Sequence, residues 1–537
     1  MDLGALKEAI QRTSLESIGR RNAFDAVVVG GGAAGGLAAE TLTRAGLRIL
    51  VLDAGSSLSP WRSPLRWSVG GLVSHLANPK ALPFMPSWML YKGRMALRLL
   101  GRIRQPVQTA CYAWERMPHA FVDDLDSPYE VDEGRPFTWI RARTLGGRVA
   151  IPGHGRQYLR FGPADFAPPD GLSPPWPFAA SELDPWYAQV ERRLGLSGRY
   201  DGISWLPDSE LKTVREPSES ETILADRIRK RWPHARPVLS RYAAPPDTLE
   251  GAADTGRLWL RQGAVVRRIE IDQGGHVKGV TWFDEETGGE QTVAAPLVFL
   301  CASALESTRI LMLSGADGGL GAKSGALGRY LMDHVMVKAE GAGPALTDET
   351  ILHEDGRCLY LPRFDSRDRC VPGEERGFGV QLYQSSIAGK SLFFTAVAFS
   401  EMLPSHSNHV SLDHSRKDRW GIPILRISCS LGPFENRRVH DQRAALRELA
   451  EAAGVLLHPI DDALPTPGSA VHECGTARMG TEPGNSVLDP FNQCWDAKGL
   501  YVTDSSAFPS QGSQNPTLTV LALTARACGH AVGRGPH

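Results

Sequence analysis

The sequence Gly30-Gly31-Gly32-Ala33-Ala34-Gly35 decides the fold, because it fits the pattern Gly-x-Gly-x-x-Gly at the junction of two contrasting segments. Residues 24–29 before it are rich in β-branched and apolar side chains, which predicts a buried strand. Residues 33–45 have the period of a buried helix, and residues 47–52 form a second apolar strand. The whole segment is therefore predicted to be a βαβ unit, the building block of a doubly wound α/β fold.

Each glycine of this motif has a predicted role at a dinucleotide site. Gly30 permits the tight turn, Gly32 lets the backbone approach a pyrophosphate, and Gly35 allows the helix to pack closely on the strand. The helix N-terminus offers free N–H groups and a partial positive charge to the phosphates. Asp53 ends the second strand about 20 residues later, where an acid binds the ribose hydroxyls and disfavours the 2′-phosphate of NADP. A purely structural glycine turn is the alternative, and this motif alone leaves FAD and NAD both open.

Composition and charge narrow the class of protein. The chain has 537 residues, more than one hydrophobic core usually organises, so two domains are expected. Its 59 basic residues balance 60 acidic ones, which gives no general attraction to nucleic acid or to an anionic membrane. The eight cysteines are dispersed without a Cys-x-x-Cys pair, so neither a zinc site nor a disulfide framework is indicated.

Residues 1–21 predict an amphipathic helix rather than a signal peptide, and no segment is apolar enough to span a membrane. We therefore expect a soluble, cytoplasmic protein.

The middle of the chain alternates between strand-like runs and turns. These runs lie at residues 258–271, 277–282, 292–300, 378–383, 392–399 and 424–430. The first three predict a small antiparallel meander that returns to a parallel strand, and the last three a mostly antiparallel second sheet within residues 335–429. Residues 436–454 predict an amphipathic helix. Residues 141–155 are glycine-rich and predict a loop entering a helix, whereas residues 56–138 form a long excursion of the kind found in lids and interfaces.

The C-terminal segment carries the motifs that decide for a flavin. In order they are His472, Gly475-Thr476, Met479-Gly480, Asp504, Ser506, Pro509 and Asn515-Pro516, the last opening a final apolar helix. On these residues the sequence resembles the glucose–methanol–choline (GMC) oxidoreductase family. The resemblance runs from residue 24 to residue 532. Within the family, the sequence most resembles the branch of pyranose oxidase, glucoside 3-dehydrogenase and fructose dehydrogenase, which acts mostly on sugar hydroxyls.

Two internal segments also resemble the family. Leu145-Gly146-Gly147, preceded by Arg141 and Arg143, is expected to bring backbone close to the pyrophosphate or flavin, with a plain loop as the alternative. Residues 301–315 resemble the family's second signature at Ser303, Ser307, Ile310-Leu311 and Ser314-Gly315. Ala302 and Glu306 depart from that signature, at a helix cap of the flavin domain, and bear on the subfamily more than on the cofactor.

The resemblance implies that His472 and Asn515 form the catalytic pair over the flavin ring. Alcohol oxidation moves a hydride to the flavin and a proton to a base, and a histidine suits the second task because its ordinary pKa lies near neutrality. An asparagine amide can hold the same hydroxyl and fix which face of the carbon meets the flavin. The alternatives are a turn histidine at His472 and a helix cap at Asn515. His530, His537 and Asp333-His334 are expected to be structural.

The motifs and the resemblance together imply one set of cofactor-binding residues. It comprises Gly30, Gly32, Ala33, Ala34, Gly35, Asp53, Ala54, Arg143, Gly146, Gly147, Val266, Ala302, Asp504, Asn515, Pro516 and Thr517. Asp504 is expected to order the backbone around the flavin, with a simple turn acid as the alternative. Some relatives attach the flavin covalently to a histidine, but Ile151 stands at the corresponding position here, so FAD is expected to be non-covalent; His154 lies close by. Residues 152–158 are expected either to line the substrate entrance or to start a packed helix.

These interpretations combine into one expected architecture. A doubly wound, Rossmann-like α/β FAD-binding domain is assembled from residues 22–160, 216–335 and 465–537. A substrate domain with a mostly antiparallel sheet is formed by residues 161–215 and 336–464. The expected reaction is FAD-dependent oxidation of a primary or secondary alcohol, on a sugar or a glycosylated natural product. The electron acceptor is oxygen, a quinone or another redox protein, with no metal involved. An NAD-dependent dehydrogenase and a non-catalytic flavoprotein are the alternatives.

Overall fold

The computed structural model describes most of the chain. The described residues are 13–15, 18, 24–55, 87–151, 153, 156–244, 248–316, 318–351, 356–364, 376–387 and 390–536. The expected N-terminal helix at 1–21 falls almost wholly outside them, as do His154, His537 and much of the 56–138 excursion. None of the helices within these ranges combines the length and the apolar character that a membrane crossing requires.

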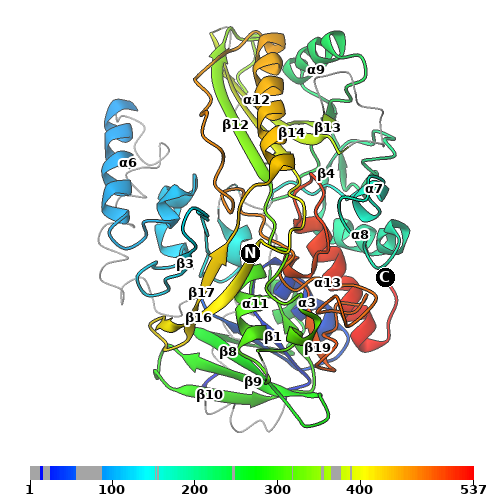
Figure 1. The fold of residues 1–537 in the computed structure, drawn as a ribbon. Helices are drawn as coiled ribbons and strands as arrows, with labels where there is room; N and C mark the ends of the chain where they lie inside the picture. The colour runs from blue at the N-terminus through cyan, green and yellow to red at the C-terminus, as the bar shows by residue number, and fades with distance from the viewer. Residues whose placement is uncertain are drawn as a thin grey trace.

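A five-stranded parallel sheet organises the lower half of the molecule (Figure 1). Its strands, in spatial order, are β19 (Leu500–Val502), β11 (Val298–Leu300), β1 (Ala26–Val29), β2 (Ile49–Asp53) and β7 (Leu258–Gln262). Every residue of β1 and β2 is buried, as expected for a parallel sheet covered on both faces. The chain leaves β1 towards β2 on one side, while β11 lies on the other. This switch in strand order places a crevice at the carboxyl end of β1.

Two long helices pack beside this sheet. The helix α3 (Ala33–Arg44) follows β1 directly, and α13 (Thr517–Val532) packs against both α3 and α8 (Ala180–Leu194). The apolar face of α3 is buried through Leu37, Ala38 and Leu42. These elements confirm the predicted βαβ unit and the final apolar helix.

The predicted meander is confirmed from residue 264 onward, whereas residues 258–262 of its first predicted run form β7 of the parallel sheet. Strands β8 (Ala264–Ile271), β9 (Val277–Asp284) and β10 (Glu290–Ala294) form a three-stranded antiparallel sheet in the order β10-β9-β8, and the chain then enters β11 of the parallel sheet. The helix α11 (Ala304–Met312) follows β11 and packs on β8.

A six-stranded antiparallel sheet forms the upper half of the molecule (Figure 1). Its order is β18 (Leu456–Leu457), β12 (Val335–Gly343), β15 (Ser391–Ser400), β14 (Phe378–Ile387), β13 (Leu359–Phe364) and β6 (Val238–Leu239). The helix α12 (Pro433–Ala453) packs on β12 and β15 and ends at Gly454, which confirms the amphipathic helix. The strand β6 comes from the range expected in the FAD-binding domain. The domain boundaries themselves stay a prediction.

Two predictions of local structure were wrong. Residues 424–430 were expected in the second sheet, but β17 (Pro423–Ser428) pairs with β16 (His409–Lys417) and with β3 (Glu130–Val131) in a separate three-stranded sheet. The parallel β17–β3 pairing joins residues almost 300 positions apart, which no local pattern reveals. Residues 141–155 were expected to enter a helix, but the described residues of this range, 141–151 and 153, contain no α-helix. They end in one 3₁₀ turn, η5 (Gly147–Ala150), after which Gln157 bridges to Tyr242 in extended conformation.

The described part of the 56–138 excursion projects from the body of the molecule, with α6 (Ser87–Gly101) at its edge (Figure 1). The remaining short elements are η2 (Gln108–Ala110), η3 (Trp114–Arg116), η4 (Pro118–Ala120), α7 (Pro163–Phe166), β4 (Ser197–Gly198), β5 (Thr213–Val214), α9 (Glu219–Arg231), α10 (Glu250–Ala253), η6 (Ala322–Ser324) and η7 (Ser505–Ala507).

Candidate active site

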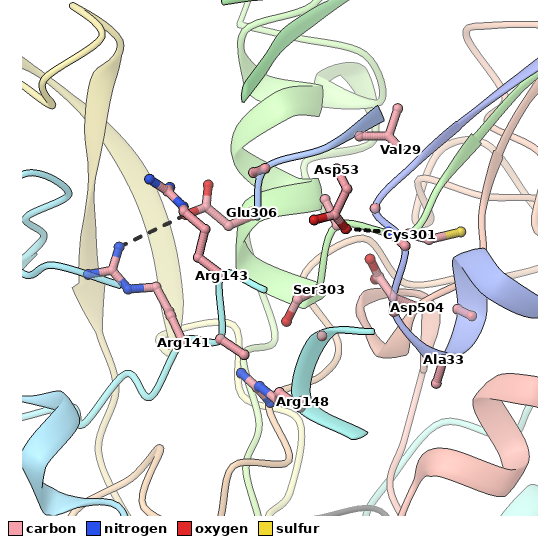
Figure 2. A pocket seen from close by; sticks show the side chains of 18 of the residues that line it. Val29, Ala33, Asp53, Arg141, Arg143, Arg148, Cys301, Ser303, Glu306 and Asp504 are labelled. Carbon is pink, nitrogen blue, oxygen red and sulfur yellow. Dashed lines mark hydrogen bonds and ion pairs between the residues drawn. The ribbon is translucent and has the colours of Figure 1, made fainter. Parts of the chain in front are cut away.

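A cavity of about 270 Å³ opens at the carboxyl end of β1, between the parallel sheet and the loops that cover it. Most of the predicted cofactor residues line it: Gly30, Gly32, Ala33, Ala34, Asp53, Ala54, Arg143, Gly147, Val266, Ala302, Asp504, Pro516 and Thr517, together with His472. Figure 2 shows Asp53 and Asp504 on one side of this cavity and Arg141, Arg143 and Arg148 on the other. The structure therefore brings together segments from both ends of the chain. Gly35, Gly146 and Asn515 do not line this cavity.

The glycine turn and the start of α3 form one wall of the cavity. Gly30 has φ +96°, a left-handed conformation that favours glycine at this tight turn. A Cβ on Gly35 would lie 1.8 Å from the carbonyl oxygen of Gly30, so Gly35 permits the close packing of helix on strand rather than touching a ligand. A Cβ on Gly32 would lie 3.8 Å from the Cα of Gly147, on the opposite wall. The two backbone segments therefore lie close together, and both line the cavity beside the N-terminus of α3, where a charged group can bind.

Asp53 is fixed by the backbone of the glycine turn. One carboxylate oxygen accepts from the N–H of Gly31 at 2.7 Å and the other accepts from the N–H of Gly55 at 2.7 Å. Burial raises the pKa of Asp53, while these two N–H groups and the charge of Arg143 oppose that shift. The carboxylate holds the turn in shape and still faces the cavity, where a ribose would lie.

Three arginines surround Glu306, one of the two residues that depart from the family signature. The guanidinium of Arg141 lies 3.9 Å from its carboxylate (Figure 2). The guanidinium of Arg309 lies 3.4 Å from the same carboxylate. Burial opposes ionisation of Glu306, but Arg309, Arg141 and Arg143 outweigh it, so the pKa of this carboxyl is lowered. Glu306 therefore balances part of the positive charge of the buried Arg141 and the half-buried Arg143 beside the cavity.

Asp504 lies in a turn and also lines the cavity. Its carboxylate accepts from the N–H and the hydroxyl of Ser506, as an acid in a turn does, and caps η7. It also accepts from the hydroxyl of Ser307 on α11 and lines the cavity. Burial raises the pKa of Asp504. Asp504 thus connects the second signature to the C-terminal segment at the cavity wall.

His472 and Asn515 are adjacent, as the sequence predicted. The Nδ2 of Asn515 lies 3.3 Å from the Nε2 of His472, although the two residues are 43 positions apart. The backbone N–H of His472 donates to Asp333 at 2.9 Å, and Gln511 donates to the carbonyl of His472 at 3.2 Å. Asn515 precedes α13 by two residues, which places its side chain at the helix start. His472 is therefore held in the cavity wall, on a segment of the chain far from the glycine turn.

Sequence reasoning missed the partners of this pair. His334, expected to be structural, contacts the ring of His472, with 2.7 Å between the two Nδ1 atoms. Gln381 on β14 donates to the Oδ1 of Asn515 at 2.7 Å. The hydroxyl of Tyr383 donates to Gln381 at 3.1 Å and accepts from Gln157 at 2.8 Å. The alternating pattern of the strand could have indicated that Gln381 and Tyr383 act together, because they are two residues apart and share one face of β14.

Ile151 is buried in a small apolar cluster with Trp114 and Ile140, and it does not line the cavity. The non-covalent attachment of FAD stays a prediction.

Comparisons with known proteins agree with this site. The model of the family "FAD binding domain" matches residues 25–307, more than half of the chain, and the model "GMC oxidoreductase" matches residues 404–524. The chain is 26% identical to a 2-methyl-1,2-propanediol dehydrogenase of Mycolicibacterium austroafricanum over 94% of each chain. It is 25% identical to a paromamine 6′-oxidase of Streptomyces fradiae, over 95% of this chain and 91% of the relative. The fold matches the pyridoxine 4-oxidase of "Mesorbium loti" with a TM-score of 0.62, at 19% identity, over 94% of this chain and 98% of that one.

The fold and the site define an FAD-dependent oxidoreductase, which resolves the choice between FAD and NAD that the glycine motif left open. The chain belongs to the GMC oxidoreductase family, whose members act on alcohol groups. Its residues fit this cofactor. The glycine backbone at Gly32 and the N-terminus of α3 line the cavity, and the buried Arg141 and the half-buried Arg143 line it as well.

Proposed function

We propose that this protein oxidises a primary or secondary alcohol, carried by a sugar or a glycosylated molecule, with His472 as the base and Asn515 as the residue that orients the hydroxyl. The observation that carries the proposal is the 3.3 Å approach of Asn515 Nδ2 to the Nε2 of His472, which lines the FAD cavity. A hydroxyl oxygen that lies beside both atoms can accept from the amide and donate to the imidazole. FAD, when bound, supplies the acceptor for the hydride that leaves the carbinol carbon.

The side chains around the pair support a polyhydroxylated substrate. Asn515, Gln381, Tyr383 and Gln157 form a connected series of amide and hydroxyl groups. Such groups both donate and accept, which matches a sugar hydroxyl better than an apolar alcohol. Relatives named for 2-methyl-1,2-propanediol and for paromamine are consistent with hydroxyl-bearing substrates.

The proton and the hydride leave in opposite directions in this arrangement. The hydroxyl proton passes to the Nε2 of His472, the O–H bond breaks, and a C=O bond forms as the hydride departs from carbon. Asn515 holds the oxygen throughout, so the carbon presents one face to the cofactor. A correctly placed general base contributes a factor of about 10² to 10⁴ in rate.

Anaerobic bleaching of the flavin tests the proposal. The holoenzyme is screened with sugars, glycosides, aminoglycosides and simple alcohols, and the most active substrates are then studied with oxygen and with a quinone dye as acceptors. His472→Ala should slow flavin reduction by about 10² to 10⁴, with little change in the dissociation constant of the substrate. His530→Ala is the matched control, because His530 stacks on Phe491 near the other end of α13.

Two outcomes would contradict the proposal. If no alcohol reduces the flavin, the protein is a non-catalytic flavoprotein. If His472→Ala reduces as fast as the native enzyme, the base lies elsewhere.

A further inference from the structure

His334 lies directly before β12 and is almost fully buried. Its ring is nearly perpendicular to that of His472, with 4.8 Å between the ring centroids. Both of its nitrogens have partners: Nδ1 lies 2.7 Å from His472 Nδ1, and Nε2 lies 2.7 Å from the carbonyl oxygen of Gly512. His334 is not a member of the catalytic pair, but it contacts one of the two residues directly.

The carbonyl of Gly512 determines the direction of these bonds. A carbonyl oxygen can only accept, so the Nε2 of His334 carries a proton. Burial lowers the pKa of His334 to about 4, which keeps the ring neutral at neutral pH. A neutral imidazole has one N–H, so the Nδ1 of His334 bears a lone pair and accepts from the Nδ1–H of His472. The Nε2 of His472 is then the unprotonated nitrogen.

A second chain of hydrogen bonds reaches the same conclusion from the other side. Gln381 accepts from Tyr383 through its carbonyl oxygen and donates through its amide nitrogen to the Oδ1 of Asn515. The nitrogen of Asn515 is therefore the atom directed at His472 Nε2. An amide N–H donates, so this nitrogen of His472 must accept. The two chains use different residues and agree on one tautomer.

We propose that His334 is a positioning residue that holds His472 in the tautomer whose Nε2 takes the hydroxyl proton, and that its Nδ1 lone pair stabilises the imidazolium formed by that transfer. The inference rests on the proposed function, in which His472 is the base. When the proton arrives at Nε2, His472 carries two N–H groups and one positive charge. The Nδ1–H bond to His334 becomes a charge-assisted bond at that moment, which stabilises the product of proton transfer more than the reactant.

Two substitutions of His334 test this role, and they differ in whether the new side chain can form the two hydrogen bonds. His334→Gln keeps an acceptor and a donor on one planar amide, spaced much like the two ring nitrogens, and should retain the rate of flavin reduction within a few-fold. His334→Leu removes both and should slow it by about 10- to 100-fold, the rate equivalent of one lost bond to a charged group. The dissociation constant of the substrate should change little in either, because His334 does not face the hydroxyl. His530→Leu serves as the matched control for replacing a histidine by leucine.

Nitrogen-15 NMR of the histidine-labelled holoenzyme gives a readout independent of turnover. The His472 signals, assigned by their loss in His472→Gln, should show Nδ1 protonated and Nε2 unprotonated. In His334→Leu they should show a mixture of tautomers. The proposal is overturned if native His472 is protonated at Nε2, or if His334→Leu reduces as fast as the native enzyme while His472→Ala is slow. If no alcohol reduces the flavin, the proposed function fails, and the NMR result still decides the tautomer. If His334→Leu does not fold, His334→Gln and the native spectrum decide.

Discussion

Substituting alanine at Gly32 and at Gly35 separates cofactor binding from folding within one six-residue motif. At Gly35 the new Cβ would lie 1.8 Å from the carbonyl oxygen of Gly30, and backbone cannot yield as a flexible side chain can. At Gly32 the nearest protein atoms are 3.8 and 3.9 Å away, and φ of −77° suits alanine, so the protein itself accommodates the methyl group. Because Gly32 lines the cavity, that methyl group would keep a pyrophosphate from approaching the backbone.

The expected magnitudes follow from these distances. Forcing a methyl-sized group into a close-packed contact costs about 1–3 kcal/mol. Gly32→Ala should therefore weaken FAD binding by about 5- to 150-fold, since about 1.4 kcal/mol is tenfold in affinity. The stability of the FAD-free protein should change little. Gly35→Ala should destabilise the FAD-free protein by the upper end of that energy range or more.

Fluorescence titration of the FAD-free protein with FAD measures the first effect, and thermal unfolding without FAD measures the second. The reasoning is refuted if Gly32→Ala binds FAD as tightly as the native protein, because the pyrophosphate would then not approach the backbone at Gly32. It is also refuted if Gly35→Ala unfolds at the native temperature.

Two further substitutions test the catalytic end of the cavity. Burial, with the nearby charge of Glu473, raises the pKa of Asp333 to about 7, so the folded protein keeps a proton that the unfolded chain loses above about pH 4. The stabilisation that this bound proton gives the folded protein is therefore lost as the pH rises from about 4 to 7. Across that window the free energy of unfolding of the native protein should fall by at most about 4 kcal/mol relative to that of Asp333→Asn. The same pH dependence of urea unfolding in the two proteins would contradict this. Gln381→Leu leaves the Oδ1 of Asn515 without its donor, so kcat/KM for the best alcohol substrate should fall by about 5- to 10-fold, and an unchanged steady-state value would remove Gln381 from the site.

The parts of the fold that depend on local patterns were predictable. The βαβ unit, the antiparallel meander and the final helix each follow from a short period of apolar residues bounded by turn residues. The same holds for the glycine wall of the cavity, because the glycine motif and Asp53 lie within one such unit. The pairing of β17 with β3 was not predictable, since the strand period fixes which face is buried but not which distant strand lies alongside.

At the catalytic residues, too, some features could be predicted from motifs in the sequence and others depended on contacts between distant residues. His472 and Asn515 were identified from motifs that resemble a family, and the structure places them together. His334 is 138 residues from His472 in the chain, and a lone histidine before a strand is more often a core residue than a catalytic partner. Glu306 shows why a departure from a motif can be informative, because its carboxylate balances arginines that lie elsewhere in the sequence.

The two ends of the cavity rest on different sheets, and this determines which substitutions should affect which step. The glycine turn and Asp53 are fixed by the parallel sheet through β1 and β2. At the other end, the dipeptide Asp333-His334 stands at the start of β12: Asp333 holds the backbone of His472, and His334 holds its ring. Gln381 lies on β14, and β12 and β14 both pair with β15 in the six-stranded sheet. One sheet therefore supports both chains of hydrogen bonds that reach the imidazole. Changes in its packing should alter proton transfer while FAD binding, which depends on the other sheet, is preserved.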